Sequence, residues 1–274
     1  MITFATSKRI TVVIAFVALS GAILVIARPI RVTGKVMSTR TKMPISDVLL
    51  FIDSSYPTAY TGVENYLRTD SSGQFTARAE GNIMAAAWKA GYAVAVYELG
   101  STMKWWRRDI IIELRELAPG HLVVENHFRE DFGNGNGFSF RLGGVVSVHN
   151  PDADIRLSID AKSNVAVLEA LGEGGIIFQP EARGIDFYNT PEAPDAGYVK
   201  QWRIDPKTLG HYFIRTRDGK HFAKLRLVRV PTPHITYWPH FAYQSDGSRN
   251  LEIAVGTDYP FPFEQFGLKR ESLK

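Results

Sequence analysis

The sequence predicts an all-β protein in which an N-terminal transmembrane helix precedes two β-sandwich-like domains. Residues 10–27 form one unbroken apolar run. Beyond residue 30 the chain consists of short runs of alternating apolar and polar residues, separated by Gly, Asp, Asn and Pro, which is typical of antiparallel sheets. Long helical periodicity is scarce. We therefore divide the chain into a membrane segment (1–30), a first β-sandwich (31–119), a second β domain (120–258), and a C-terminal strap and tail (259–274).

The apolar run from Ile10 to Ala27 has the length of a membrane span. Eighteen helical residues cover roughly 27 Å at about 1.5 Å each, close to the hydrocarbon thickness of a bilayer. Cleaved signal peptides usually have a shorter core of about 7–15 residues, which favours an uncleaved anchor. We expect the chain to be held on the extracytoplasmic face of a bacterial inner membrane. The alternative, cleavage after Ala27, would release it.

The composition excludes several chemistries. With no cysteine, the chain forms no disulfide, carries no lipidated cysteine, and has neither thiol catalysis nor a cysteine-based zinc site. A secreted eukaryotic protein would more often contain disulfides, so we expect a bacterial source. The formal net charge of +4 permits contact with anionic polymers without requiring it. No phosphate-binding or dinucleotide motif is present, and we expect neither a cofactor nor a nucleic-acid partner.

The first domain carries four short motifs in a fixed order. They are Arg31–Val36 (RVTGKV), Met43–Val48 (MPISDV), Arg68–Phe75 (RTDSSGQF) and Ala90–Tyr92 (AGY). Together they resemble the carboxypeptidase regulatory-like domain, a small transthyretin-like β-sandwich without catalytic residues of its own. The resemblance implies about seven strands, with Val48 and Phe75 buried and Gly73 in a turn that requires positive φ. It covers about a quarter of the chain, and it implies an accessory or binding role.

The second domain is predicted to contain seven or so short strands in a second sandwich or a barrel. The segment Ile110–Leu117 before it fits a short helix or a strand. Two hairpins are predicted, one around Asp218-Gly219 and one around Asp246-Gly247. The earlier strands are expected at Phe138–Leu142, Gly144–His149, Ile155–Asp160, Val165–Leu171 and Gly175–Phe178, after a flexible loop at Asp131–Gly137.

The hairpin around Asp218-Gly219 contains the leading binding-site candidate. A two-residue loop pairs Phe213 with Lys224 and Arg215 with Phe222, so that apolar side chains share one face and cations the other. We name the second the cationic face; its candidate residues are Arg215, Arg217, Lys220, Phe222, Lys224 and Arg226. We expect its cations to be exposed and to bind an anionic glycan, lipid or protein. The alternative is an ordinary solvated face that protects a sheet edge.

Three other clusters are candidate sites. His127–Glu130 matches the H-x-x-E motif, which with His234 would suit a zinc carboxypeptidase, but the chain is too short and too poor in helices for that fold. His234 and His240 would suit a metal or haem site, although Pro231, Pro233 and Pro239 predict an irregular loop or a sheet edge there. Trp105–Arg108 would suit a membrane surface or a glycan, or an inter-domain contact.

The sequence therefore predicts a non-catalytic binding or scaffolding protein of the bacterial cell envelope. We name no catalytic residue and no metal ligand. The first alternative is a hydrolase acting on envelope polymers, which requires a cleft where carboxylates, or a histidine and a carboxylate, converge. The second is a carrier of haem or a metal ion that uses His234 and His240.

Overall fold

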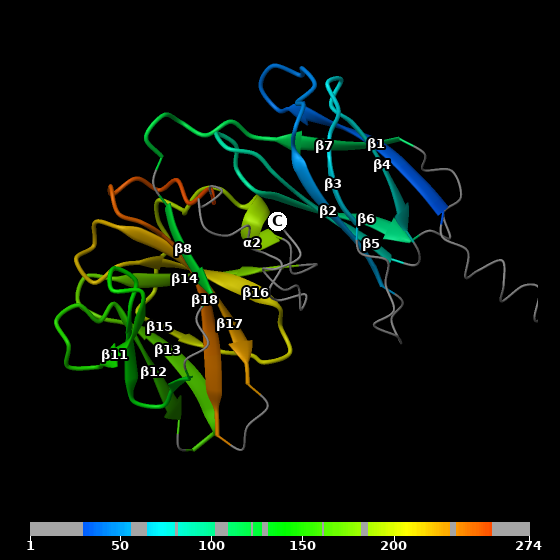
Figure 1. Cartoon of the computed structure of the whole chain (residues 1–274). Helices are drawn as coiled ribbons and strands as arrows, with labels where there is room; N and C mark the ends of the chain where they lie inside the picture. Colours follow the sequence, from blue (N-terminus) through cyan, green and yellow to red (C-terminus); the bar gives the residue numbers. More distant parts are fainter. Residues whose placement is uncertain are drawn as a thin grey trace, which may run out of the picture. The chain divides into compact units, whose positions relative to one another are not determined.

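The computed structural model describes residues 30–55, 65–79, 82–101, 109–121, 123–127, 131–160, 162–181, 186–230 and 234–253 (Figure 1). The predicted membrane segment, Trp105–Arg108, Glu130 and the C-terminal strap lie outside these residues. Among the helices within them, none is long and apolar enough to span a bilayer. The described chain is all-β, as predicted, and its one helical element is α2 (Asp186–Asn189).

The chain divides into two compact units. Among the described residues, the first unit holds 30–87 and Tyr97–Glu113, and the second holds Trp88–Val96 and 114–253. The strands that lie wholly or mostly in the first unit are β1 (Ile30–Ser38), β2 (Leu49–Ser55), β3 (Asn65–Arg68), β4 (Gln74–Ala79), β5 (Asn82–Trp88), β6 (Ala95–Ser101) and β7 (Asp109–Leu114). The domain limits predicted from the sequence stay a prediction.

The first unit is β-sandwich-like, with the sheets β4-β1-β7 and β3-β2-β5-β6. Val48 and Phe75 are buried, as predicted, and β7 resolves the earlier ambiguity as a strand. Gly34 pairs with Phe75 across β1 and β4, and a Cβ on Gly34 would lie 2.4 Å from the Phe75 ring. The phenylalanine therefore reaches the core only because residue 34 has no side chain.

The turn before β4 is built by Asp70. Its Oδ1 accepts hydrogen bonds from the backbone N–H groups of Ser72 and Gln74, which lowers the pKa of the carboxyl group. Gly73 follows with φ of 72°, a conformation that strains other residues. The motif thus forms the turn that the sequence predicted.

The second unit has two antiparallel sheets, β11-β10-β12-β13-β15 and β14-β16-β17-β18-β8, with β9 also paired to β18 (Figure 1). Its strands are β8 (Val123–His127), β9 (Phe132–Gly133), β10 (Asn136–Ser139), β11 (Gly144–Ser147), β12 (Ile155–Asp160), β13 (Val165–Ala170), β14 (Gly175–Pro180), β15 (Gln201–Arg203), β16 (Gly210–Arg215), β17 (Phe222–Arg229) and β18 (Thr236–Gln244). One apolar cluster takes residues from both sheets, including Leu157 and Leu168 from the first and Ile214 and Leu225 from the second. The arrangement is β-sandwich-like. The loop predicted at Asp131–Gly137 contains β9 and the start of β10 instead.

Pro239 lies inside strand β18, where the sequence predicted an irregular loop or a sheet edge. Val230 N–H donates to the Thr236 carbonyl, which therefore points toward β17. The N–H and carbonyl of a strand residue point to the same side, and the side alternates along the strand. Even-numbered residues of β18 therefore direct their N–H groups toward β17, and odd-numbered residues direct theirs away from it. The missing N–H of Pro239 therefore falls on the other side. On that side the described pairing of β18 passes from β9 at Tyr237 to β8 at His240, so none of the described ladder bonds requires an N–H at Pro239.

The second predicted hairpin is also wrong. After Gly247 the chain does not return along β18: Leu251 N–H donates to the Pro191 carbonyl, and Ala193 N–H donates to that of Arg249. The end of the described chain therefore packs beside residues 191–193. Together these two segments cover the face of β16 and β17 that was expected to meet solvent.

Candidate functional site

The first predicted site, the cationic face, has the predicted register but is not an exposed strip. Phe213 pairs with Lys224 and Arg215 with Phe222, as predicted, although the turn is wider and begins after Thr216. The Lys224 side chain is fully buried: its Nζ donates to the carbonyls of Phe187 at 2.6 Å and Thr190 at 3.1 Å. The expectation of an exposed strip is wrong because residues 186–193 lie over this face of the sheet.

Most of the other side chains of the cationic face also have contacts within the unit. The Arg215 guanidinium lies 5.1 Å from the Tyr198 ring centre, and Arg217 donates to the Asn150 carbonyl at 3.3 Å. Phe222 is half-buried, whereas Lys220 is exposed. Arg226 donates to both carboxylate oxygens of Glu181, at 3.0 and 2.8 Å. That the cationic face binds an anionic partner stays a prediction.

Glu181 links Arg226 to a buried histidine. Its Oε1 lies 2.6 Å from Nδ1 of His211, and both side chains are fully buried. Burial would raise the pKa of Glu181, but the His211 hydrogen bond and the Arg226 charge outweigh it and hold that pKa below its usual value. Burial lowers the pKa of His211 despite the carboxylate. Neutral His211 therefore donates from Nδ1 to an ionised Glu181.

The histidines proposed as ligands do not share a site. His234 is exposed just before β18, whereas His240 is buried within it and packs 4.3 Å from the Phe187 ring. No group of three or more His, Asp or Glu side chains suited to a metal ion occurs in the described ranges. The side chain of His127 lies outside what the structure describes, so the H-x-x-E motif is not tested.

A different site lies where the two sheets of the second unit separate. Val199 and Ile176 exchange backbone hydrogen bonds of 2.8 and 3.0 Å, which joins this segment to β14. One residue later, the Lys200 carbonyl accepts from Ala170, and β15 then pairs with β13 in the other sheet. The chain thus passes from one sheet to the other. Next to this point lies an opening lined by residues of β14, β15 and β16.

Aromatic side chains line this opening. Alternation in β15 turns Trp202 inward while its two neighbours in the strand stay exposed. The Trp202 and Phe178 rings are stacked with centres 5.7 Å apart, and Phe178 lies 5.0 Å from Tyr212. A Cβ on Gly210 would lie 2.4 Å from the Phe178 ring, so the glycine allows that ring to lie over the backbone of β16. We name this opening the aromatic hollow.

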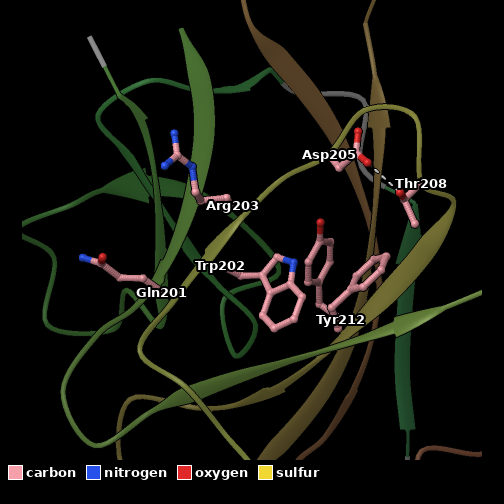
Figure 2. Close-up of a pocket in the computed structure, with 7 residues that line it drawn as sticks. Gln201, Trp202, Arg203, Asp205, Thr208 and Tyr212 are labelled. Atoms are coloured by element: carbon pink, nitrogen blue, oxygen red, sulfur yellow. Dashed lines mark hydrogen bonds between the residues drawn. The ribbon is translucent and has the colours of Figure 1, made fainter. Parts of the chain in front are cut away.

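Polar side chains form the rim of the aromatic hollow. Figure 2 shows the Trp202 and Tyr212 rings with Asp205 and Thr208 nearby, and Gln201 and Arg203 directed away from the rings. The Asp205 carboxylate accepts from Lys207 N–H and from the Thr208 hydroxyl, and both bonds hold its pKa below the usual value. The hollow has a volume of about 410 Å³, within the range of small-molecule sites.

Two polar groups of the aromatic rings are open to solvent and to a ligand. Among the described residues, neither the Trp202 indole N–H nor the Tyr212 hydroxyl has a hydrogen-bond partner. Burial raises the pKa of Tyr212, so its hydroxyl stays protonated and able to donate. Trp and Tyr side chains usually pair their polar end when the ring is buried. A ligand in the hollow could satisfy both groups.

A second hollow, which we name the polar hollow, adjoins the first. It lies on the outer face of β12, β13 and β15, has a volume of about 460 Å³, and shares Gln201 and Arg203 with the aromatic hollow. Its remaining lining includes Ser158, Asp160 and Glu169. Arg203 bonds Asp160 at 3.0 Å, and Arg156 pairs with Glu169, so the charges here are balanced.

Sequence reasoning missed both hollows. Gln201, Trp202 and Arg203 alternate like any half-buried strand, and a single inward tryptophan is usual in a core. The signal lies in the long-range pairing of Val199 with Ile176, which local patterns do not contain.

Comparison with known proteins adds little. No family model and no curated protein matches the chain. A streptococcal ancillary pilin is 12% identical, with a TM-score of 0.24; the match covers 77% of this chain, which spans only 59% of the pilin. A Bacteroides uniformis protein, to which carbohydrate binding has been provisionally assigned, is 6% identical with a TM-score of 0.22, over 76% of this chain and 94% of its own. Likenesses this weak carry no argument about fold or function.

Proposed function

We propose that this chain is a non-catalytic carbohydrate-binding protein of the bacterial cell envelope, and that the aromatic hollow is its binding site. The observation that carries the proposal is the Phe178–Trp202–Tyr212 group at an open edge of the sandwich, with an indole N–H and a hydroxyl that no described residue satisfies. A sugar ring presents an apolar C–H face to an aromatic ring and hydroxyl groups around its edge. The hollow has the complementary arrangement.

The rim favours a hydroxyl-rich ligand over a purely apolar one. Asp205 is an ionised acceptor beside the rings and the Thr208 hydroxyl lies next to it, whereas Arg203 and Gln201 stand at the outer edge of the hollow. A purely apolar ligand would remove these groups, and the polar groups of Trp202 and Tyr212, from water. It would offer them no hydrogen bonds in return, and the loss of hydration would therefore weaken binding. A sugar can bond to them and still cover the rings.

The cellular location belongs to the same proposal. The uncharged run at residues 10–27, flanked by basic residues, supports export and retention at the membrane. The four motifs of residues 31–98 support an accessory domain similar to the carboxypeptidase regulatory-like domain. Cell fractionation with sequencing of the mature N-terminus tests the location: a soluble cytoplasmic protein would contradict export, and a mature start at Arg28 would contradict retention.

The binding function is tested with an array of defined neutral and acidic glycans and the full-length chain, purified in a detergent without a sugar headgroup. We expect binding to one or more glycans, weakened about 30-fold or more by Trp202→Ala, as for a buried aromatic anchor. Trp238→Ala is the matched control, because Trp238 is half-buried elsewhere and its Nε1 is bonded to Asp131. A folded chain that binds no glycan, or binding equally sensitive to both substitutions, would contradict the proposal.

A further inference from the structure

We propose that the ligand is a neutral oligosaccharide of at least two sugar rings that crosses strand β15, one ring in the aromatic hollow and the next in the polar hollow. This inference rests on the proposed function and names its ligand class. Each hollow alone has a volume typical of a small-molecule site. A monosaccharide would occupy one hollow and leave the other filled with water.

The two hollows share Gln201 and Arg203 on β15, which is a short edge strand. It pairs with β13 on one side only, and among the described residues its other side has no strand partner. Trp202 faces inward, whereas Gln201 and Arg203 face outward and line both hollows. A ligand that reaches from the Trp202 ring to the outer face of the sheet must therefore pass these two side chains.

The polar hollow has the chemistry of a second sugar subsite. It contains no aromatic ring, but it combines the Ser158 hydroxyl, the carboxylates of Asp160 and Glu169, and the Arg203 guanidinium. Glu169 accepts from the Gln201 amide at 3.2 Å and from the Ser158 hydroxyl at 3.3 Å, so this network extends across the strand. Carboxylate and guanidinium groups form bidentate bonds with adjacent hydroxyls.

The charge balance of the polar hollow selects a neutral ligand. Arg203 already faces Asp160, and Arg156 faces Glu169. An acidic sugar would meet the carboxylates of Asp160 and Glu169, and a basic sugar would meet the Arg203 guanidinium. A neutral sugar has neither repulsion, and its hydroxyls can bond to donors and acceptors alike.

Calorimetric titration of the full-length chain tests the inference with mono-, di-, tri- and tetrasaccharides of the cello, malto and chito series. We expect affinity to rise at least about tenfold from mono- to disaccharide in the series that binds, as one or two added hydrogen bonds would give. Glu169→Gln and Ser158→Ala should abolish most of this gain and leave monosaccharide affinity unchanged. Trp202→Ala should weaken every ligand of the series. Glu192→Gln, an exposed carboxylate outside both hollows, is the control.

The outcomes separate the inference from the function on which it rests. Three results would overturn the inference while the aromatic hollow remained a sugar site. They are equal affinity for mono- and oligosaccharides, a length dependence that survives both polar-hollow substitutions, and a preference for acidic oligosaccharides. Binding of no sugar by the folded chain, including those on the array, would overturn both.

Discussion

The buried carboxylate of Glu181 provides the sharpest test of how the second unit is held together. It accepts from His211 at 2.6 Å and from Arg226 at 3.0 and 2.8 Å, while the Arg226 side chain is only 14% exposed. Glu181→Gln keeps the shape of the side chain but removes its charge. It also replaces one carboxylate oxygen, which accepts hydrogen bonds, by an NH₂ group, which donates them. His211 and Arg226 are themselves donors, so one of these bonds is lost.

The expected cost follows from the burial of the charges. Removing one partner of a buried ion pair typically destabilises a protein by about 3–5 kcal/mol, since the remaining charge stays out of water. For a unit of this size, each kcal/mol lowers the melting temperature by about 2–4 °C. Glu181→Gln should therefore lower the melting temperature by about 6–20 °C.

Differential scanning calorimetry of the full-length chain measures this change. The matched control is Glu192→Gln, because Glu192 forms an exposed pair with Arg249 at 2.7 Å and should contribute about 0–1 kcal/mol. If the two substitutions lower the melting temperature equally, Glu181 is not the buried partner of Arg226 and His211. The burial of the cationic face would then also be wrong.

The remaining predictions concern pH, a buried lysine and a glycine. The pKa values of His211 and Glu181 are both held below their usual 6.5 and 4.5, so the unfolded chain binds protons that the folded chain does not. Stability should therefore fall below pH 6.5 and again below 4.5. In denaturant titrations His211→Asn should remove the first fall and keep the second, with the second changed in size because His211 contributes to the lowered pKa of Glu181. Lys224→Met should lower the free energy of unfolding by about 1.5–3 kcal/mol, because the bonds to two backbone carbonyls are lost. Lys220 is exposed, so Lys220→Met should lower it by less than about 0.5 kcal/mol. Equal unfolding midpoints for the two variants would contradict the buried position of Lys224. Gly34→Ala should cost about 1–3 kcal/mol, because its Cβ would lie 2.4 Å from the Phe75 ring, and an unchanged melting temperature would contradict that packing.

Local sequence patterns predicted most of the strands and the pairing of the first hairpin. The alternation from Tyr212 to Leu227 required the register in which Phe213 pairs with Lys224, because a shift by one residue would expose the core face. The Asp70–Gly73 turn was readable for the same reason: its side-chain bonds and its positive φ involve neighbouring residues.

What failed depends on contacts between distant segments. The polar pattern of β16 and β17 suggested a face in water, but the pattern does not tell whether residues 186–193 cover it. Lys224 and Arg226 tolerate burial because Phe187 and Glu181 provide their partners, far away in the sequence. Pro239 suggested a loop or a sheet edge because its place in β18, between the residues that pair with β9 and those that pair with β8, depends on segments far away in the sequence. The aromatic hollow depends likewise on one long-range bridge.

The most direct test of the central claim observes the indole N–H of Trp202 itself. The chain has five tryptophans, and comparison of ¹H–¹⁵N spectra with and without Trp202→Phe assigns its indole signal. During titration with the neutral oligosaccharide that binds best on the array, we expect the Trp202 signal to shift progressively and to saturate with the calorimetric dissociation constant. A sugar that binds while the Trp202 signal stays in place, or an array with no binding sugar, would contradict the account.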